Sequence, residues 1–311
     1  MKKDKTFSVL IPARNEGANI GQLIEDILSQ ELPDYVHLEK LVVVSDGSTD
    51  NTNEVVREHA AEDQRVELII NPKNLGKAPS LNIGMRQIES EFLVLLDGDV
   101  RLNGPHTLGN LLEDIGGDID MVGGNPIPSD KEDSLAALVS RCGDIMRNDL
   151  MVRIRNGSNI YSAHGRILAL SRRLYTTIEL PIDEEEDQYI YLWCVKQNLR
   201  YVFRPDAEVF FKLPTSFTDY LRQCVRFMFS AGKIKAYFGD KRLSREYKIP
   251  LHIKVITYAN LWRKEPLGAL CWTGYRVIVR TEFFVRRYLL KKGYGAAWAV
   301  SESTKGSISR P

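Results

Sequence analysis

Two aspartates separated by one glycine follow a strongly apolar stretch of the sequence. Phe92 to Leu96 are all apolar, and Asp97-Gly98-Asp99 comes next. A strand that is apolar on both faces is typical of a covered parallel sheet, whose carboxyl edge binds ligands. Two carboxylates can hold a hard cation such as Mg²⁺ or Mn²⁺ and leave coordination positions for substrate phosphates. The pattern therefore predicts metal-assisted chemistry on a nucleoside diphosphate, although Asp and Gly are also common turn residues.

A second acidic cluster, residues 183–187, comes just before a helix pattern at residues 188–197. A carboxylate in such a place can act as a general base that takes a proton from a hydroxyl group. Acidic side chains are equally suited to the first turn of a helix, where they compensate the helix dipole. The residue types alone leave both roles open.

Strand and helix patterns alternate through the first hundred residues. Strand patterns occur at residues 7–11, 41–44, 66–70 and 92–96, and helix patterns at residues 20–30, 52–61 and 78–88. Such alternation predicts βαβ units, and hence an α/β fold with a mainly parallel sheet flanked by helices. A polar cluster follows each strand, at residues 12–16, 45–50, 71–77 and 97–99. The carboxyl ends of parallel strands share one edge, so these clusters are expected to meet.

The second half is less regular. Short strands are expected at residues 121–124, 167–171, 201–203 and 207–211, and helices at residues 134–150 and 188–197. The last seventy residues are rich in basic and aromatic side chains. We expect a catalytic domain at residues 1–235 and a basic, mainly helical extension at residues 236–311.

A helix pattern in the extension separates basic from apolar side chains. The basic stripe contains Arg276, Arg280, Arg287 and Lys291, and the apolar side contains Ile278, Val285, Tyr288 and Leu289. This arrangement is typical of a helix that lies on a membrane surface. An ordinary helix packed on the domain with a solvated basic face fits the pattern equally well.

The bulk properties bound the function. The chain has 311 residues, is 43% hydrophobic and carries a formal net charge of +1, which favours a large folded core and argues against a nucleic-acid binder. Its four cysteines contain no CxxC pair, so we expect neither a zinc site nor a disulfide framework but a reducing, cytoplasmic setting. The N-terminal residues indicate neither a signal peptide nor an anchor, and no stretch reaches the roughly 20 apolar residues of a membrane span. Peripheral contact with the cytoplasmic membrane face stays open.

Taken together, the strand-end clusters resemble the motifs of the family 2 glycosyltransferases, which have the GT-A fold. The resemblance covers roughly residues 6–232 and rests on SVLIPARNE, VVVSDGSTDNT, NLGKAPSLNIG, LLDGDV, EEEDQ and QCVRF, in the order of the family. It implies a Rossmann-like nucleotide-binding sheet and inverting transfer of a sugar from a nucleoside diphosphate sugar, a UDP-sugar by preference. The acceptor would be a hydroxyl of a glycan or of a lipid-linked molecule. The cofactor would be Mg²⁺ or Mn²⁺.

The same resemblance assigns donor-binding roles. Asp46 would accept a hydrogen bond from the nucleotide base, Lys77 would favour phosphate, and Asp97 would contact both the nucleotide and the metal. Asp99 would be the metal ligand that bridges to the diphosphate. The nucleotide pocket would also be lined by Pro12, Ala13, Arg14 and Glu16.

Acceptor roles follow from the second half of the resemblance. Asp187 of the Glu186-Asp187 pair would be the general base of the single displacement, and Glu186 would contact the acceptor or the diphosphate. The sequence Gln223-Cys224-Val225-Arg226-Phe227 is similar to the Gln-x-x-Arg-Trp motif of the family. Gln223, Arg226 and Phe227 would therefore contact the acceptor or the diphosphate. Phe227 stands where the motif has tryptophan, which weakens the expectation of a processive enzyme. The acceptor-side loop would contribute His164 and Gly165.

Two other functions share part of this pattern. Sugar nucleotidyltransferases also use aspartates and magnesium. Members of that class share a Gly-rich loop with Arg and Lys directly after the first strand, whereas this chain has PARNEGANI at that position. A non-catalytic relative that only binds nucleotide sugars would be expected to have lost some of the aspartates, and Asp46, Asp97, Asp99 and Asp187 are all present. Dinucleotide oxidoreductases would need a GxGxxG motif, which the sequence does not contain.

Overall fold

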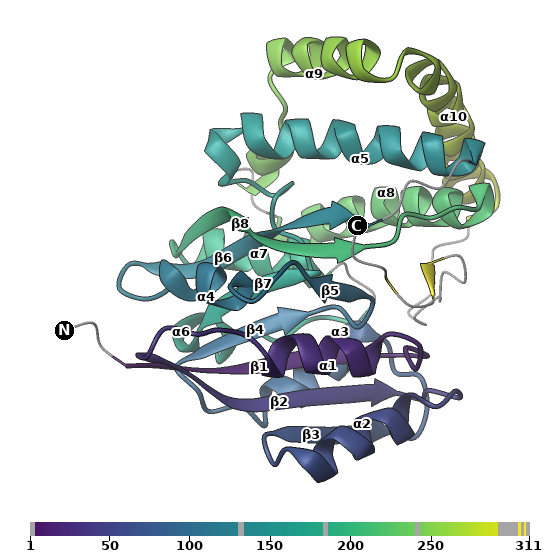
Figure 1. Cartoon of the computed structure of the whole chain (residues 1–311). Coiled ribbons are helices and arrows are strands. Elements are labelled where there is room, and N and C mark those ends of the chain that lie inside the picture. The colour runs from purple at the N-terminus through teal and green to yellow at the C-terminus, as the bar shows by residue number, and fades with distance from the viewer. Residues whose placement is uncertain are drawn as a thin grey trace.

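One mixed sheet organises the protein (Figure 1). The computed structural model describes residues 4–129, 134–182, 186–239 and 243–291, together with residues 304, 305 and 308. Within these residues the sheet has eight strands in the order β3-β2-β1-β4-β7-β6-β8-β5. Pairs β3-β2, β2-β1, β1-β4 and β6-β8 are parallel, and β4-β7, β7-β6 and β8-β5 are antiparallel. The predicted α/β fold with a mainly parallel sheet is confirmed.

The N-terminal half contains every strand and helix predicted for it, with slightly different ends. Its four strands all run in the same direction, and a helix follows each of the first three. These elements are β1 (Lys5–Ala13), α1 (Ile20–Leu28), β2 (Val36–Asp46), α2 (Thr52–Glu62), β3 (Val66–Asn71), α3 (Lys77–Met85) and β4 (Phe92–Leu96).

The following elements mix predicted and unpredicted features. The pattern missed β5, α4 and α6, and α7 is the first element after the undescribed residues 183–185 of the acidic run. The elements are β5 (Val100–Leu102), α4 (Thr107–Glu113), β6 (Ile119–Pro128), α5 (Leu135–Arg153), η1 (Arg155–Gly157), β7 (Ile167–Ser171), α6 (Arg172–Tyr175), α7 (Glu186–Lys196) and β8 (Arg200–Phe211).

The prediction of two short strands at residues 201–203 and 207–211 was wrong, because β8 is one strand. Pro205 interrupts the sequence pattern, since proline lacks the N–H that a ladder needs. The pairing with β6 passes from Gly123 opposite Phe203 to Asn125 opposite Glu208. The interruption is therefore a bulge inside a continuous strand.

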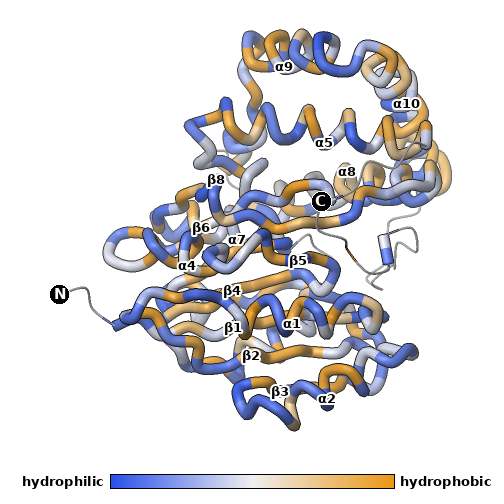
Figure 2. The backbone as a smooth tube through the Cα atoms, in the orientation of Figure 1, coloured by the Kyte–Doolittle hydropathy of each residue, from blue (hydrophilic) through white to orange (hydrophobic). Residues whose placement is uncertain are grey.

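Side chains of the central strand divide the core between the two faces of the sheet. Phe92, Val94 and Leu96 belong to a hydrophobic cluster with α1, α2 and α4, whereas Leu93 and Leu95 belong to a second cluster with α3 and α7. This alternation follows from the two-residue period of a strand. Figure 2 shows the apolar centre of the sheet. Burial on both faces fixes the place where β4 ends, and hence the place of Asp97.

A helical layer covers one end of the molecule (Figure 1). A third hydrophobic cluster holds this layer together. It joins side chains of α5, α8, α9 and α10, among them Cys142, Phe229, Leu261 and Trp272. The predicted domain boundary at residue 235 falls inside α8. The elements are α8 (Phe217–Phe238), η2 (Leu243–Tyr247), α9 (Leu251–Lys264), α10 (Pro266–Phe284) and the π-helical η3 (Val285–Leu289).

The two-sided helix expected from residue 276 onward differs from the structure. The regular α-helix ends at Phe284, and the π turn of η3 changes the angular spacing of the residues that follow. The buried side of α10 contains Trp272, Tyr275 and Val279, so the basic stripe and the apolar residues opposite it are both largely exposed. In the part of the chain that the structure describes, no helix is both long and apolar enough to cross a membrane.

Candidate functional site

The loops after β1 and β2 hold each other in place. Asn15 has a φ of 53°, a left-handed conformation that asparagine tolerates. Its side-chain Oδ1 accepts a hydrogen bond from Thr49 N at 2.9 Å, and its own N–H donates to Ser48 Oγ at 3.2 Å. Glu16 N donates to Thr52 Oγ1 at 2.9 Å. These crossed hydrogen bonds make two of the predicted strand-end clusters one continuous surface at the carboxyl edge of the sheet.

Asp46 ends β2 and is completely buried. Its Oδ1 accepts hydrogen bonds from Asn71 Nδ2 at 3.1 Å and Leu75 N at 2.9 Å, and its Oδ2 accepts one from Gly76 N at 2.8 Å. The carboxylate thus positions the loop that leads into α3. Its predicted hydrogen bond with a nucleotide base stays a prediction, and such contact would require this loop to move.

The Asp97-Gly98-Asp99 turn is held from behind by Asn19. The amide Nδ2 of Asn19, which is 2% exposed, donates to Gly98 O at 2.8 Å and to Val100 O at 3.0 Å. These two carbonyls flank Asp99 on either side in the sequence. One buried side chain therefore fixes the backbone on both sides of the predicted metal ligand, a role that the sequence analysis missed.

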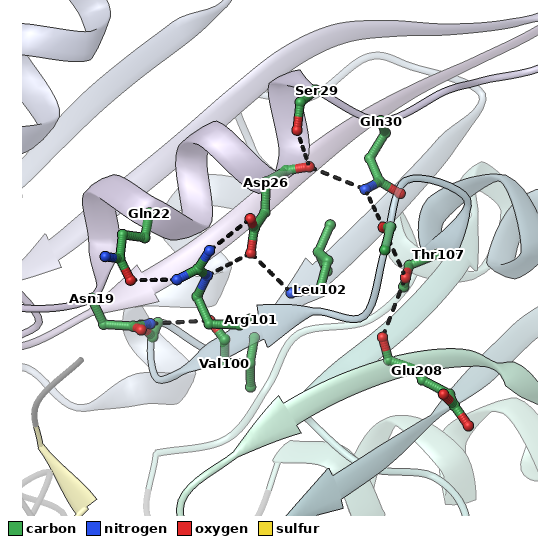
Figure 3. Close-up of polar contacts among 12 residues, drawn as sticks. Asn19, Gln22, Asp26, Ser29, Gln30, Val100, Arg101, Leu102, Thr107 and Glu208 are labelled. Carbon is green, nitrogen blue, oxygen red and sulfur yellow. Dashed lines mark hydrogen bonds and ion pairs between the residues drawn. The ribbon is translucent and has the colours of Figure 1, made fainter. Parts of the chain in front are cut away.

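A buried ion pair supports the same turn one residue further along (Figure 3). Arg101 Nε and Nη2 donate to the two carboxylate oxygens of Asp26 at 2.6 and 2.9 Å. Asp26 Oδ2 also accepts from Leu102 N at 3.2 Å. Two parallel bonds between a guanidinium and a carboxylate fix orientation as well as distance. Helix α1 and strand β5 are thereby locked together next to the turn.

Lys77 joins the turn to the acidic cluster. Its Nζ lies 2.6 Å from Asp97 Oδ1 and also contacts Glu186 Oε1. Gly76, with a φ of 105°, allows the sharp entry into α3 that directs this lysine toward the sheet edge. Burial disfavours the charged amine, but the Asp97 and Glu186 carboxylates outweigh it and raise the pKa of Lys77. Residues more than one hundred positions apart in the sequence therefore meet at one cation.

Asp187 lies at the first turn of α7, beside Glu186. Its Oδ2 accepts a hydrogen bond from Gly165 N at 3.4 Å. A Cβ atom on Gly165 would lie only 3.1 Å from both Lys77 Nζ and Glu186 Oε1. Glycine is therefore the residue that lets the loop before β7 approach the acidic pair this closely. A small pocket between these elements is lined by Pro12, Lys77, Leu81, Asp97, Gly165 and Glu186.

Two arginines that the sequence analysis missed lie near this centre. Burial and the Asp97 carboxylate raise the pKa of Asp99, and Arg166 opposes that shift. Burial and the neighbouring charge of Arg166 lower the pKa of Arg147, although its ion-pair partner Asp144 and, to a smaller extent, Asp187 oppose that shift. The position of Arg166 directly after the predicted His164-Gly165 loop was the signal that could have identified it.

His164 is kept neutral by its surroundings. Burial, together with Arg147 and Arg166, lowers the pKa of His164 well below its usual value. Its Nε2 is buried and has no hydrogen-bond partner among the residues that the structure describes. A neutral ring nitrogen in this position can accept or donate a hydrogen bond, which keeps acceptor contact as a prediction.

The remaining predicted residues lie around this centre. Pro12 and Ala13 belong to the end of β1, Arg14 Nη1 donates to Asp46 O at 3.4 Å, and Glu16 is 4% exposed. The predicted acceptor contacts Gln223, Arg226 and Phe227 lie on α8, where the Arg226 guanidinium is 5.5 Å from the centroid of the Phe227 ring. Helix α8 also reaches α7, because Tyr189 donates a hydrogen bond to Tyr237 at 3.3 Å. The acceptor role of these three α8 residues stays a prediction.

The donor set of the turn suits a hard divalent cation. Asp97 and Asp99 offer carboxylate oxygens, and Mg²⁺ and Mn²⁺ prefer oxygen ligands. No cluster of three or more His, Cys, Asp or Glu side chains with metal-site geometry occurs in the described ranges. Two protein carboxylates leave several coordination positions for phosphate oxygens, which is the usual arrangement for a cation bound together with a nucleotide.

The solved structures that resemble the chain share its fold. One is the mannosyltransferase PcManGT from Pyrobaculum calidifontis in complex with GDP-Man and Mn²⁺, at 19% identity and a TM-score of 0.56, covering 92% of this chain and 81% of that one. Another is glucosyl-3-phosphoglycerate synthase from Mycobacterium tuberculosis in complex with Mn²⁺, UDP-Glc and phosphoglyceric acid, at 18% identity and a TM-score of 0.53, covering 76% and 81% of the two chains.

Curated relatives match the chain over shorter stretches. Dolichyl-phosphate beta-glucosyltransferase ALG5A of Trichomonas vaginalis is 32% identical over 97 residues, which is 30% of each protein. Glycosyltransferase AglE of Haloferax volcanii is 33% identical over 121 residues, which is 38% of each protein. The matches thus span about a third of the length of these relatives. The model of the family "Glycosyl transferase family 2" matches residues 8–177, more than half of the sequence, so the chain belongs to glycosyl transferase family 2.

Proposed function

We propose that this protein transfers a sugar from a nucleoside diphosphate sugar to a hydroxyl group, with inversion at the sugar carbon. The contact of Lys77 with both Asp97 and Glu186 carries the proposal. It brings the predicted metal and diphosphate site next to the predicted base, which is the proximity that a single displacement needs. Neither a nucleotidyltransferase nor a binding protein would need a base at that place.

In this mechanism Asp187 takes the proton of the acceptor hydroxyl while that oxygen attacks the sugar carbon. The hydrogen bond from Gly165 N orients the Asp187 carboxylate, and the ion pair with Lys77 holds the adjacent Glu186 in place. A positioned general base contributes about 10²- to 10⁴-fold to a rate.

Asp97 and Asp99 would hold a Mg²⁺ or Mn²⁺ ion together with the diphosphate. When bound, the cation supplies positive charge that stabilises the leaving nucleoside diphosphate. The structural relatives named above contain Mn²⁺ with either GDP-Man or UDP-Glc, which supports a metal and leaves two nucleotides to test. We propose a UDP-sugar first, with Arg14, Glu16 and Asp46 shaping the nucleotide pocket.

The acceptor is proposed to be a glycan or a lipid-linked molecule at a membrane surface. On α9, Leu251, Val255 and Trp262 form one exposed apolar stripe, with exposed fractions of 76%, 61% and 46%. On α10, Leu267 and Leu270 are 76% and 61% exposed. We call these five residues the apolar face.

The same two helices also carry exposed basic side chains, including Lys254, Arg263, Lys264 and Arg280. Apolar groups inserted into the headgroup region and cations beside anionic lipids favour binding in combination. We therefore propose that residues 236–311 are an extension that lies on the cytoplasmic membrane face and presents lipid-linked acceptors to residues 1–235.

The donor proposal is tested by thermal melting of the protein with Mn²⁺ and each of UDP-glucose, UDP-GlcNAc, GDP-mannose and ADP-glucose. A donor should raise the melting temperature only when Mn²⁺ is present, since ligands that bind the folded state stabilise it. NAD with Mn²⁺ is the negative control. Stabilisation by none of the four nucleotide sugars would contradict the proposal.

The membrane proposal is tested by flotation with liposomes that contain phosphatidylglycerol. The double variant Leu267→Glu and Leu270→Glu should float much less than the wild type, and neutral liposomes should recover less of either protein. Ile70→Glu is the matched control, because Ile70 is also exposed, at 43%, but lies on β3 outside the extension. Equal flotation of the double variant and the control would contradict membrane contact.

A further inference from the structure

A lysine from the C-terminal segment contacts the predicted nucleotide pocket. Lys305 Nζ lies within hydrogen-bond distance of Glu16 Oε1 and donates to Arg14 O at 3.2 Å. Both partners belong to the loop after β1. The contact joins residues 289 positions apart in the sequence.

The partner of this lysine packs directly against the metal-binding turn. A Cβ atom on Gly98 would lie 2.9 Å from Glu16 Cγ and 3.4 Å from Pro12 O. Lys305 therefore lies one side chain away from the Asp97-Gly98-Asp99 turn, at the same edge of the sheet as the proposed diphosphate position.

The contact combines a charge with an apolar anchor. The side chain of Lys305 is only 21% exposed and that of Glu16 only 4% exposed. Three residues later, Ile308 is 3% exposed. Burying a lysine costs free energy unless its charge is paired. Burial and the nearby charge of Arg14 lower the pKa of Lys305 to about 8, and the Glu16 carboxylate is the anionic partner of its ammonium group.

A donor diphosphate would change this balance of charge. Lys77, the lysine predicted from the sequence to bind phosphate, already contacts two carboxylates. A bound diphosphate places further negative charge beside the turn, and lysine, a mobile point charge with three N–H donors, can exchange one anionic partner for another.

We propose that Lys305 is a donor-binding residue whose ammonium group moves from Glu16 to the diphosphate when the nucleotide sugar binds. Glu16 keeps the lysine beside the proposed diphosphate position until the donor binds. This inference rests on the proposed function, because it assumes that the site binds a nucleoside diphosphate.

The test is isothermal titration of the 311-residue protein with UDP and with GDP in the presence of Mn²⁺. The variants are Lys305→Gln, which removes the charge, and Lys305→Arg, which keeps it. Lys40→Gln is the control, since Lys40 is an exposed lysine that pairs with Glu67 away from the site. The same proteins are titrated with UMP and GMP, which lack the second phosphate.

We expect Lys305→Gln to weaken diphosphate binding about tenfold, equivalent to about 1.4 kcal/mol. Monophosphate binding should change less than about twofold, and Lys305→Arg should keep most of the diphosphate affinity, because its charge remains. A purely structural role would weaken mono- and diphosphates alike and would overturn the inference, as would unchanged or tighter diphosphate binding by Lys305→Gln. If the wild type binds neither UDP nor GDP, the proposed function fails together with this inference. If the wild type binds and Lys305→Gln matches it, only the inference fails.

Discussion

Replacing Lys77 by methionine removes the cation shared by Asp97 and Glu186 while keeping a side chain of similar length. The two carboxylates would then stay partly buried without their partner. Breaking a fully buried ion pair costs about 3–5 kcal/mol. The side chains of Lys77, Asp97 and Glu186 are 19%, 21% and 11% exposed, so solvent screens part of the effect. We expect a loss of stability of about 2–3 kcal/mol.

The loss is measured by thermal melting in EDTA, where it should lower the melting temperature by roughly 3–5 °C, because the unfolding entropy grows with chain length. Lys73→Met is the matched control, because Lys73 is an exposed lysine in the same loop. Added Mn²⁺ should raise the melting temperature of Lys77→Met more than that of the wild type, since Lys77 no longer competes with the cation for Asp97. The reasoning would be refuted by a loss no greater than that of the control, or by equal responses to Mn²⁺.

Three further changes test the centre from other directions. Asn19→Asp replaces the amide group that donates to the carbonyls of Gly98 and Val100 by a carboxylate, which can only accept, so the free energy of unfolding should fall by about 2–3 kcal/mol. Mn²⁺-dependent nucleotide binding, measured by calorimetry, should weaken as well. Unaltered binding would mean that Asn19 contributes to stability alone. Gly165→Ala places a methyl group against the ion pair between Lys77 and Glu186, so the free energy of unfolding, measured with urea, should fall by about 1–3 kcal/mol. An unchanged free energy would mean that the loop before β7 can shift to make room for the methyl group. The lowered pKa of His164 means that the unfolded chain gains a proton below about pH 6.5 that the folded protein does not bind, so stability should fall as the pH falls from there toward the folded pKa. His164→Gln should flatten part of this decline in melting temperature, and an unchanged pH profile would contradict the assignment.

The fold could be predicted because its strongest signals are local. The run from Phe92 to Leu96 is apolar at every position, and the structure buries all five side chains on two faces of the sheet. Strand-end clusters also converge as expected, because parallel strands bring their carboxyl ends to one edge. The contact of Lys77 with Asp97 follows from this rule, whereas the place of Glu186 in the same site was expected only from the family motifs.

The missed features depend on contacts between distant residues. Asn19 resembles an ordinary helix-cap residue in the sequence, and only the fold brings its amide to the carbonyls of Gly98 and Val100. The contact between Lys305 and Glu16 has no local signal at all. Asp46 shows the opposite case, because its position was predicted but its hydrogen bonds with the backbone of the next loop were not.

The central claim is that Asp187 is the base of a single displacement. It is tested most directly by the single-turnover rate of Asp187→Asn with the nucleotide sugar and acceptor that the wild type uses. Asp118→Asn, at an exposed aspartate, is the control. We predict a loss of about 10²- to 10⁴-fold in rate with nucleotide affinity unchanged. Transfer by Asp187→Asn within tenfold of the control rate, at equal nucleotide affinity, would contradict the account.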